Sequence, residues 1–319
     1  MRLIYFGSGE FGLPTLTSLV EAGHDIAAVI TQPDRPAGRK RLPTATPIAA
    51  WAERQGLPVF KKENVNEPPF VDQIAALEPQ ASVVIAFGQK LSPSLIDAMG
   101  RLAVNLHASL LPRYRGAAPI NRAMIADEAM TGVSVIGLAQ KMDAGPVYAT
   151  RQTEIDPAET AGQLHDRLAE LGPAAIAEVL EQLESGTLAP TTQDEASATS
   201  APKFKKTDGT VDFALESRQV RARVHGLTPW PGCRVVWRSG HSGQEQTLTL
   251  KRVVDHADDP ASRTGRPLPG VVLPDLRIAC GSGSVELQEL QLPGGKPLTF
   301  DQFQRGHRVR RGDTLSPLS

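Results

Sequence analysis

The side chains best suited to chemistry lie in the run from Asn105 to Gly116. Asn105 and His107 are two residues apart at the end of an expected strand, so in extended geometry their side chains share one face. An Asn amide can donate a hydrogen bond to a developing oxyanion, and a His can donate, accept or carry a proton near pH 7. A lone His at a strand end is more often structural, but the paired Asn and the Leu-Pro turn that follows favour a catalytic pair.

Asp143 is a candidate orienting group for this pair. It lies in the Gly- and Pro-containing loop 141–146, after an expected strand at 132–138. A carboxylate against an imidazole fixes its tautomer, which a proton-transfer site requires. By itself an Asp in such a loop is an ordinary turn former. Its candidacy therefore depends on whether the strands that end at His107 and at residue 138 are neighbours.

The turn Gly7-Ser8-Gly9-Glu10-Phe11-Gly12 has the spacing of a dinucleotide-binding loop. Such a site also needs an acidic residue at the end of the second strand to hold a ribose hydroxyl. Here that strand ends Thr31-Gln32-Pro33, and the nearest acid, Asp34, lies beyond the proline. The sequence therefore favours glycines that allow tight strand-to-helix packing over a nicotinamide site.

The first 150 residues alternate apolar runs of strand length with amphipathic segments, which predicts βαβ units and a largely parallel sheet. A long helix is expected from an N-cap at Asp156 to Gly186, with a break at Gly172-Pro173. Sites on such sheets lie beyond the carboxyl ends of the strands. The expected strands are 2–6, 25–31, 81–87, 102–106 and 132–138, and the expected shorter helices are 11–22 and 70–77.

Residues 187–209 are rich in Thr, Ser, Ala, Pro and Gln and read as an interdomain linker. A helix at 215–225 follows, and then short apolar runs separated by Gly, Pro and Asp, which predict a small barrel of roughly five strands. The expected strands are 234–238, 247–254, 277–280 and 285–292.

The charge is unevenly distributed along the chain. The 319 residues hold 34 basic and 35 acidic side chains, a net charge of −1. Residues 1–202 hold 16 basic and 23 acidic side chains, and residues 203–319 hold 18 and 12, giving −7 and +6. This asymmetry is compatible with a second domain that meets a polyanion. Basic candidates there are Lys203, Lys205 and Lys206, followed by Arg218, Arg221 and Arg223 on the expected helix.

The two cysteines, Cys233 and Cys280, have no CxxC spacing or nearby His cluster, so neither a disulfide framework nor a zinc site is indicated. The N-terminal apolar run is too short for a signal sequence, and no stretch approaches the ~20 apolar residues that span a bilayer. We therefore expect a cytoplasmic protein without a membrane partner.

The pattern Asn-x-His-x-Ser-Leu-Leu-Pro-x-Tyr-Arg-Gly, with the later Met-Asp-Ala-Gly loop, resembles the folate-dependent formyltransferases that use 10-formyltetrahydrofolate. Three further segments, 31–39, 116–120 and 229–232, make the whole chain most similar to the branch that formylates methionyl initiator tRNA. One departure is the first turn, where the family more often has Ala-Gly-Thr-Pro.

The resemblance implies a Rossmann-like formyltransferase domain at 1–189 that binds formyl-folate, a linker at 190–207 and an OB-like tRNA-binding domain at 208–319. It implies a monomer that uses 10-formyltetrahydrofolate as co-substrate and no metal, and a cis bond at Leu111-Pro112 would suit the folate-contacting turn. The implied catalytic residues are Asn105, His107 and Asp143; the folate-binding residues are Ser109, Leu110, Leu111 and Pro112; the tRNA-binding residues are Arg39, Lys40 and Arg41 of a basic insertion, with the linker lysines.

Three alternatives remain open at the level of sequence. The first is a formyl-folate enzyme that acts on a sugar amine or a purine precursor, because the transfer chemistry would be identical. The second, in a different class, is a nicotinamide oxidoreductase. The third is a tRNA-binding protein without catalysis.

Overall fold

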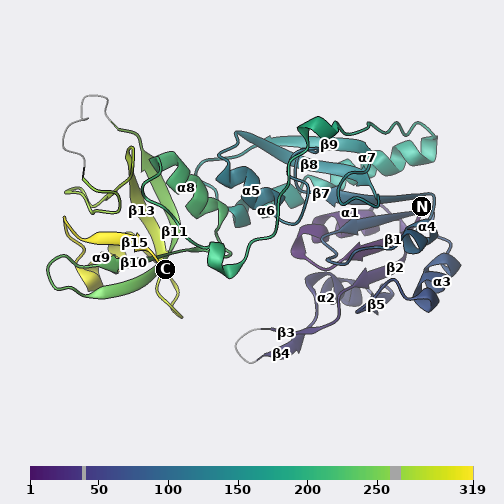
Figure 1. Cartoon of the computed structure of the whole chain (residues 1–319). Coiled ribbons are helices and arrows are strands. Elements are labelled where there is room, and N and C mark those ends of the chain that lie inside the picture. Colours follow the sequence, from purple (N-terminus) through teal and green to yellow (C-terminus); the bar gives the residue numbers. More distant parts are fainter. Residues whose placement is uncertain (38–40, 259–266, 319) are drawn as a thin grey trace. The chain divides into compact units, whose positions relative to one another are not determined.

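The computed structural model describes residues 1–37, 41–258 and 267–318 (Figure 1). The chain forms two compact units. The N-terminal unit comprises residues 1–116, 132–153 and 165–200, and the C-terminal unit comprises residues 117–131, 154–164 and 201–319. Two segments that precede residue 165 therefore belong to the C-terminal unit. The division expected from the sequence, 1–189, 190–207 and 208–319, stays a prediction.

The N-terminal unit is built on a seven-stranded sheet in the order β5-β2-β1-β6-β7-β8-β9. The first five of these strands pair in parallel, and β8 then runs antiparallel to β7. The expected α/β fold is confirmed. The strands are β1 (Arg2–Gly7), β2 (Asp25–Thr31), β5 (Val59–Lys61), β6 (Ala81–Ile85), β7 (Leu102–His107), β8 (Met130–Gly137) and β9 (Val147–Glu154).

Helices cover both faces of this sheet. On one face, Ile4, Phe6 and Val84 pack against Phe70 and Ile74 of α3 in a single apolar cluster, which α4 completes. On the other face lie α1 and α7, where a Cβ placed on Gly172 would come 2.4 Å from Thr15 Oγ1. The helices are α1 (Leu13–Glu21), α2 (Pro47–Arg54), α3 (Pro68–Ala76), α4 (Pro93–Ala98), α6 (Ala161–Ala169) and α7 (Gly172–Ser185).

The long helix expected after an N-cap at Asp156 begins four residues later than predicted, at Ala161. Asp156 accepts a hydrogen bond from the Ala158 N–H and so closes a turn of its own. The reciprocal capping pair is instead Thr160 and Gln163, directly before α6. The expected break at Gly172 is confirmed, because α6 ends at Ala169 and α7 starts at Gly172.

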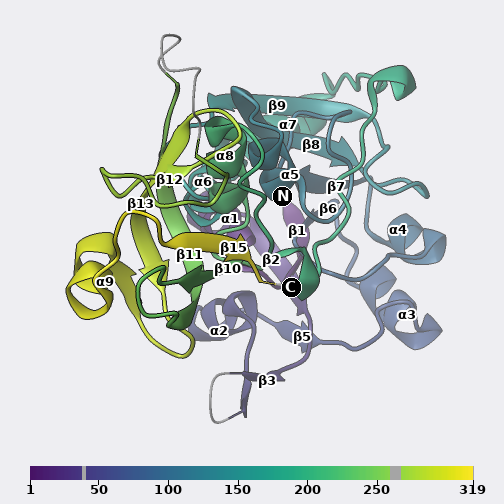
Figure 2. The same cartoon turned by 60° about the vertical axis from the view of Figure 1, so that its left-hand side comes forward.

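The C-terminal unit is a nearly closed antiparallel barrel with the strand order β12-β13-β11-β10-β15, as Figure 2 shows from a second side. The short segment 270–272 hydrogen-bonds to both end strands and so closes the barrel. Buried Trp237 lies in the core and donates its indole N–H to Asp313. The strands are β10 (Cys233–Arg238), β11 (Glu245–His256), β12 (Ile278–Ala279), β13 (Ser284–Gln291), β14 (Pro297–Thr299) and β15 (Thr314–Pro317), and the helices are α5 (Pro119–Ile125), α8 (Ser217–Gly226) and α9 (Phe300–His307).

The barrel expectation is confirmed, and the structure adds β14, β15 and the helix α9 to the predicted elements. Helix α5 comes early in the sequence but packs on α8, and its Ile125 packs against the barrel core. In the part of the chain that the structure describes, no helix is long and apolar enough to cross a membrane.

Candidate active site

His107 ends β7 and is buried, with 6% of its surface exposed. Its Nε2 lies 2.9 Å from the carbonyl oxygen of Tyr114. A carbonyl can only accept, so Nε2 carries the hydrogen. Nδ1 faces Oδ2 of Asp143 at 3.6 Å, which is an electrostatic pair and longer than a hydrogen bond. The imidazole is thus held at one nitrogen and faces a carboxylate with the other.

Asp143 lies in the loop between β8 and β9, and its side chain is 13% exposed. β7 and β8 are paired neighbours, as the sequence required; β8 ends beside Val104, and the loop that follows brings the carboxylate back to His107. Its Oδ2 also accepts a 2.8 Å hydrogen bond from the Gly116 N–H. One oxygen therefore connects the loop after β8 with the turn after β7.

Asn105 is half-buried on β7, in register with Val84 of β6 and Ile136 of β8. The strand alternation puts its side chain on the same face as His107. Among the contacts of the described residues, its side-chain amide has no hydrogen-bond partner. This amide is a donor available to a developing negative charge.

The turn after β7 is fixed by two serines. The buried Ser109 hydroxyl donates to the Arg113 carbonyl at 2.7 Å, and Ser134 on β8 donates to the Ser109 carbonyl at 2.7 Å. Ser134 also accepts from the Leu111 N–H. The Leu111-Pro112 bond is cis, as the sequence suggested. The Ser109 hydroxyl is thus engaged within the turn, while Leu110, Leu111 and Pro112 are half-buried.

Positive φ angles occur in three loops that follow central strands of this sheet. Ala86, Tyr114 and Asp143 all have positive φ angles, of 47°, 64° and 54°, and they follow β6, β7 and β8. L-residues with positive φ cost free energy and cluster at functional sites. Sequence analysis missed the Ala86 loop, because no residue type marks it.

Two of the three glycines in the first turn serve close packing. A Cβ on Gly12 would come 2.1 Å from the Tyr5 hydroxyl, and one on Gly7 would come 2.6 Å from the Tyr5 ring, whereas one on Gly9 would meet only Ala86 Cβ at 3.4 Å. The Tyr5 hydroxyl donates to the Gly12 carbonyl from the buried interior. Close packing therefore accounts for Gly7 and Gly12 without a dinucleotide.

The expected RNA-binding residues lie on both units. Arg39 and Lys40 fall outside the described residues, and Arg41 is exposed in the connection between the strands β3 (Arg35–Ala37) and β4 (Leu42–Thr44). In the C-terminal unit, the three linker lysines at 203, 205 and 206 are exposed, while Phe204 between them is buried under the Arg122 guanidinium at 3.8 Å. The buried ring turns the neighbouring lysines outward.

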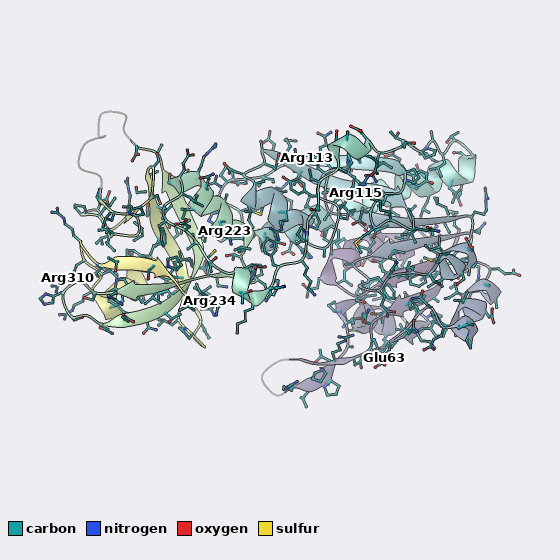
Figure 3. The ribbon with its side chains drawn as sticks, in the orientation of Figure 1. Glu63, Arg113, Arg115, Arg223, Arg234 and Arg310 are labelled. Atoms are coloured by element: carbon teal, nitrogen blue, oxygen red, sulfur yellow. The ribbon has the colours of Figure 1, made fainter. Side chains whose placement is uncertain are left out.

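Two of the three arginines on α8 point inward and were misread as surface candidates. Arg221 pairs with Asp127 and Asp255, and Arg223, which Figure 3 labels, donates to the carbonyls of Asp208 and Thr210. These interactions account for the charges of the two side chains. The sequence could not show them, because the carboxylates and carbonyls come from other segments of the chain. Arg218 is 63% exposed and pairs with Glu216 and Asp127.

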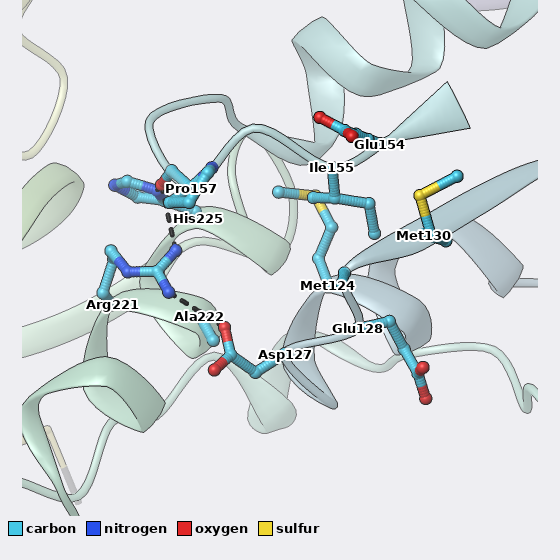
Figure 4. A pocket seen from close by; sticks show the side chains of 11 residues that line it. Met124, Asp127, Glu128, Met130, Glu154, Ile155, Pro157, Arg221, Ala222 and His225 are labelled. Atoms are coloured by element: carbon cyan, nitrogen blue, oxygen red, sulfur yellow. Dashed lines mark hydrogen bonds and ion pairs between the residues drawn. The ribbon is translucent and has the colours of Figure 1, made fainter.

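A hollow of about 380 Å³ lies within the C-terminal unit and is lined by Met124, Asp127, Arg221 and His225, among others (Figure 4). Its size suits a small ligand. However, Arg221 and Asp127 pair with each other, and none of the candidate catalytic residues lines it. We therefore assign it no ligand.

The α/β sheet, the His107–Asp143 pair and the half-buried Asn105 amide without a partner among the described residues suit a group-transfer enzyme of the α/β class. The chain belongs to the formyl transferase family: the family's N-terminal model matches residues 1–180, and the model of its C-terminal domain matches residues 203–308.

Curated relatives match along the whole chain. A methionyl-tRNA formyltransferase of Geobacter metallireducens is 40% identical over 317 residues, covering 99% of this chain and 98% of that protein. One of Allorhizobium ampelinum is 40% identical over 320 residues, with the same coverage.

Solved structures share the fold at low identity. The N-formyltransferase of Helicobacter canadensis, in complex with folinic acid and dTDP-3-aminofucose, has a TM-score of 0.67 and 12% identity, covering 90% of this chain and 99% of that one. HypX of Aquifex aeolicus, in complex with tetrahydrofolic acid, has a TM-score of 0.62 and 16% identity, covering 95% of this chain and 47% of that one.

Proposed function

We propose that this chain transfers the formyl group of 10-formyltetrahydrofolate to the free amino group of methionyl initiator tRNA, giving formylmethionyl-tRNA for translation initiation. The observation that carries the proposal is the likeness to curated methionyl-tRNA formyltransferases, at 40–41% identity over at least 96% of their length. The available Asn105 amide and the His107–Asp143 pair supply groups that acyl transfer needs.

The reaction breaks the bond between the formyl carbon and N10 of the folate and forms one to the methionyl nitrogen. An α-amino group with a pKa near ~7.7 is substantially neutral at the pH of the cytosol, so no strong base is needed for attack. Asn105 donates to the oxygen on which negative charge develops. His107 moves the proton from the attacking nitrogen towards N10 through Nδ1, because Nε2 donates to the Tyr114 carbonyl and Nδ1, at 3.6 Å from Asp143, makes no hydrogen bond with its carboxylate.

The folate lies against the turn Ser109-Leu110-Leu111-Pro112 in this proposal. The half-buried side chains at 110–112 offer an apolar edge, and the serine hydroxyl holds the turn from within. The tRNA is held by Arg39, Lys40 and Arg41 and by the exposed Lys203, Lys205 and Lys206, which neutralise its phosphates.

The decisive assay incubates the protein with 10-formyltetrahydrofolate and methionyl initiator tRNA and measures formylated aminoacyl-tRNA. A dTDP-amino sugar, a purine precursor and NAD serve as parallel substrates. Formylation of the tRNA supports the proposal. Turnover of a sugar amine, hydride transfer with NAD, or tRNA binding without turnover would replace it with the corresponding alternative.

Catalytic roles are tested by Asn105→Ala and Asp143→Ala. Removal of one oxyanion donor typically costs ~10²- to 10³-fold in kcat, so we expect Asn105→Ala to fall in this range with little change in tRNA affinity. We expect a strong loss for Asp143→Ala as well. Near wild-type kcat in both variants would refute these roles.

The tRNA contact is tested by Arg39→Ala in a titration of kcat/KM for charged tRNA against salt. We expect weaker use of tRNA, a shallower salt dependence and unchanged folate binding. Arg101→Ala is a matched control, because Arg101 is exposed before the amino end of β7. Identical activity of Arg39→Ala and wild type at every salt concentration would remove the contact.

We further propose that the protein acts as a monomer in the cytoplasm, with the catalytic and RNA-binding parts divided at 190–207. Light scattering after gel filtration measures the mass directly. A species heavier than the 34.2 kDa chain would contradict the monomer.

A further inference from the structure

Residues 191–200, which belong to the expected linker, form a strap bonded to both loops of the candidate active site. Val147, at the start of β9, exchanges two 2.8 Å backbone hydrogen bonds with Thr191. At the other end of the strap, Thr199 accepts from the backbone N–H groups of Arg115 and Tyr114, both at 2.8 Å. The strap therefore connects the turn after β7 with the loop between β8 and β9.

Gln193 is the buried side chain in the middle of this strap and is 8% exposed. Its amide nitrogen donates to the carbonyl oxygens of Asp143 at 2.8 Å and Gly145 at 2.7 Å. Its amide oxygen accepts from Nε and Nη2 of Arg115, at 3.0 and 2.8 Å. A guanidinium can only donate, so Arg115 sets which end of the amide faces the carbonyls.

The two hydrogen bonds from Gln193 hold the backbone of residues 143–145, which combines a positive φ with a close approach to Gly137. Asp143 has a φ of 54°, and a Cβ on Gly145 would come 1.8 Å from the Gly137 carbonyl. Asp adopts a positive φ more readily than most residues, but the conformation still costs free energy that surrounding contacts offset. The two bonds from Gln193 enforce it here on both sides of Ala144.

The same network also fixes the partner of the carboxylate. Arg115 directly precedes Gly116, whose N–H donates to Asp143 Oδ2. Arg115 is 8% exposed and further held by Glu195, which also pairs with Lys141. Gln193 and Arg115 therefore control the backbone of Asp143 and the amide that its carboxylate contacts.

We propose that Gln193, oriented by Arg115, is a positioning residue for the transfer reaction, because it holds the loop that presents the Asp143 carboxylate to His107. The proposal deepens the proposed function and, for its kinetic arm, rests on it.

The kinetic test compares Gln193→Glu and Gln193→Ala with Thr192→Ala, an exposed neighbour on the strap. Gln193→Glu keeps the shape and the contact with Arg115 but turns an oxygen towards two carbonyls. Loss of an outer partner of a catalytic group typically costs about 10- to 100-fold, so we expect kcat to fall by that factor while KM for both substrates changes less than about 3-fold. Thr192→Ala should match wild type. Wild-type kcat in a folded Gln193 variant, or an equal loss in Thr192→Ala, would overturn the proposal.

A double-mutant cycle separates positioning from a general structural role. If Gln193 acts through Asp143, the loss in Gln193→Ala should largely vanish in an Asp143→Asn background. Additive losses would contradict the proposal. Thermal unfolding of each variant shows whether the folded fraction, and not the site, explains a loss.

A second readout does not depend on the acceptor. Nitrogen-15 NMR of labelled histidine, recorded at one fixed pH, reports the two ring nitrogens of His107, and Asp143→Asn gives their chemical shifts without the facing carboxylate. We expect both Gln193 variants to move these chemical shifts in the same direction as Asp143→Asn, and Thr192→Ala to leave them unchanged. Unchanged His107 chemical shifts in the folded Gln193 variants would overturn the positioning role even if wild type formylates no tRNA. Absence of formylation by wild type, with the chemical shifts moved, would overturn the proposed function alone.

Discussion

Two buried histidines, one in each unit, differ in what their second ring nitrogen meets. In both His107 and His225, one nitrogen donates to a backbone carbonyl, that of Tyr114 at 2.9 Å and that of Pro157 at 3.0 Å. The second nitrogen of His107 faces the Asp143 carboxylate. The second nitrogen of His225 accepts a hydrogen bond from the Val253 N–H at 3.1 Å.

This second partner decides what each ring can do. A backbone N–H matches only a neutral imidazole, and burial together with the nearby Arg221 and Arg252 lowers the pKa of His225 to about 4. His225 is therefore a neutral structural bridge between α8, β11 and the 154–164 segment. A carboxylate, unlike a backbone N–H, can face either form of an imidazole, which suits the proton-transfer role proposed for His107. Burial alone does not separate the two, since 6% of His107 and 1% of His225 are exposed.

Truncating the two rings should lower different quantities: kcat for His107 and the free energy of unfolding for His225. These are the largest effects in this comparison. His107→Ala removes a proton-transfer group and should lower kcat by ~10²-fold or more, with the folded state retained. His225→Ala leaves the Pro157 carbonyl and the Val253 N–H unpaired in a cavity, and should lower the free energy of unfolding by about 2–4 kcal/mol. Steady-state kinetics and urea denaturation of both variants measure the two losses.

The comparison would fail if His107→Ala mainly lowered the free energy of unfolding, or if His225→Ala also lowered kcat. A His225→Ala protein with a low kcat per folded molecule would mean that this ring also serves the reaction.

Acid should weaken the fold through His225. Its pKa is lowered from 6.5 to about 4 in the folded state, so the unfolded chain takes up the proton first. The stabilising contribution is complete above pH ~6.5 and declines as the pH falls towards 4, by up to about 3 kcal/mol. Denaturation at pH 7 and pH 4.5 in wild type and His225→Gln isolates this part of the slope.

The denaturation experiment has a matched control and an outcome that would contradict it. His241→Ala changes an exposed histidine and should keep the wild-type slope. If His225→Gln kept that slope as well, the neutral bridge would not be the source of the acid sensitivity.

The smallest expected effect comes from Glu195, at the exposed edge of the His107 surroundings. Hydrogen bonds from Arg115 and then Lys141 hold the pKa of Glu195 at about 2. Glu195 itself is 58% exposed, and a Gln there keeps an acceptor oxygen for the buried Arg115, so Glu195→Gln should change kcat by less than ~3-fold. The kcat of the purified variants measures this effect. A loss as large as that of Gln193→Ala would show that the exposed Glu195 also helps to set the surroundings of His107.

Local patterns in the sequence predicted much of this site. The alternation along β7 put Asn105 and His107 on one face, and the Gly-Pro loop marked Asp143. The strands of the parallel sheet and the break before α7 followed from apolar periodicity and from Gly172-Pro173. Each of these signals lies within a few consecutive residues.

Long-range pairing produced what the sequence did not reveal. Gln193 lies in a Ser- and Thr-rich segment that resembles a linker, and its partners are Asp143, Gly145 and Arg115. Arg221 looked like a surface cation until the fold brought Asp127 and Asp255 to it. For such polar side chains, the neighbouring residues in the sequence do not indicate that the side chain is buried.

The charge asymmetry also changes when it is counted by unit. The N-terminal unit holds 15 basic and 18 acidic side chains, and the C-terminal unit holds 19 and 17, giving −3 and +2. Residues 117–131 and 154–164 bring five acidic side chains and one basic side chain into the C-terminal unit. A polyanion would therefore meet local groups of lysine and arginine and not a strongly basic unit.

The interleaving of the two units has a consequence for synthesis on the ribosome. Helix α5 packs with the barrel, yet β15, which completes the pairing of β10, follows it by roughly 180 residues. At a synthesis rate of about 5–20 residues per second, some 10 to 40 s pass between the synthesis of α5 and that of the last barrel strand, and during this time the apolar side of α5 lacks the complete barrel. The N-terminal sheet can form during that interval, whereas the C-terminal unit is among the last parts of the newborn chain to mature.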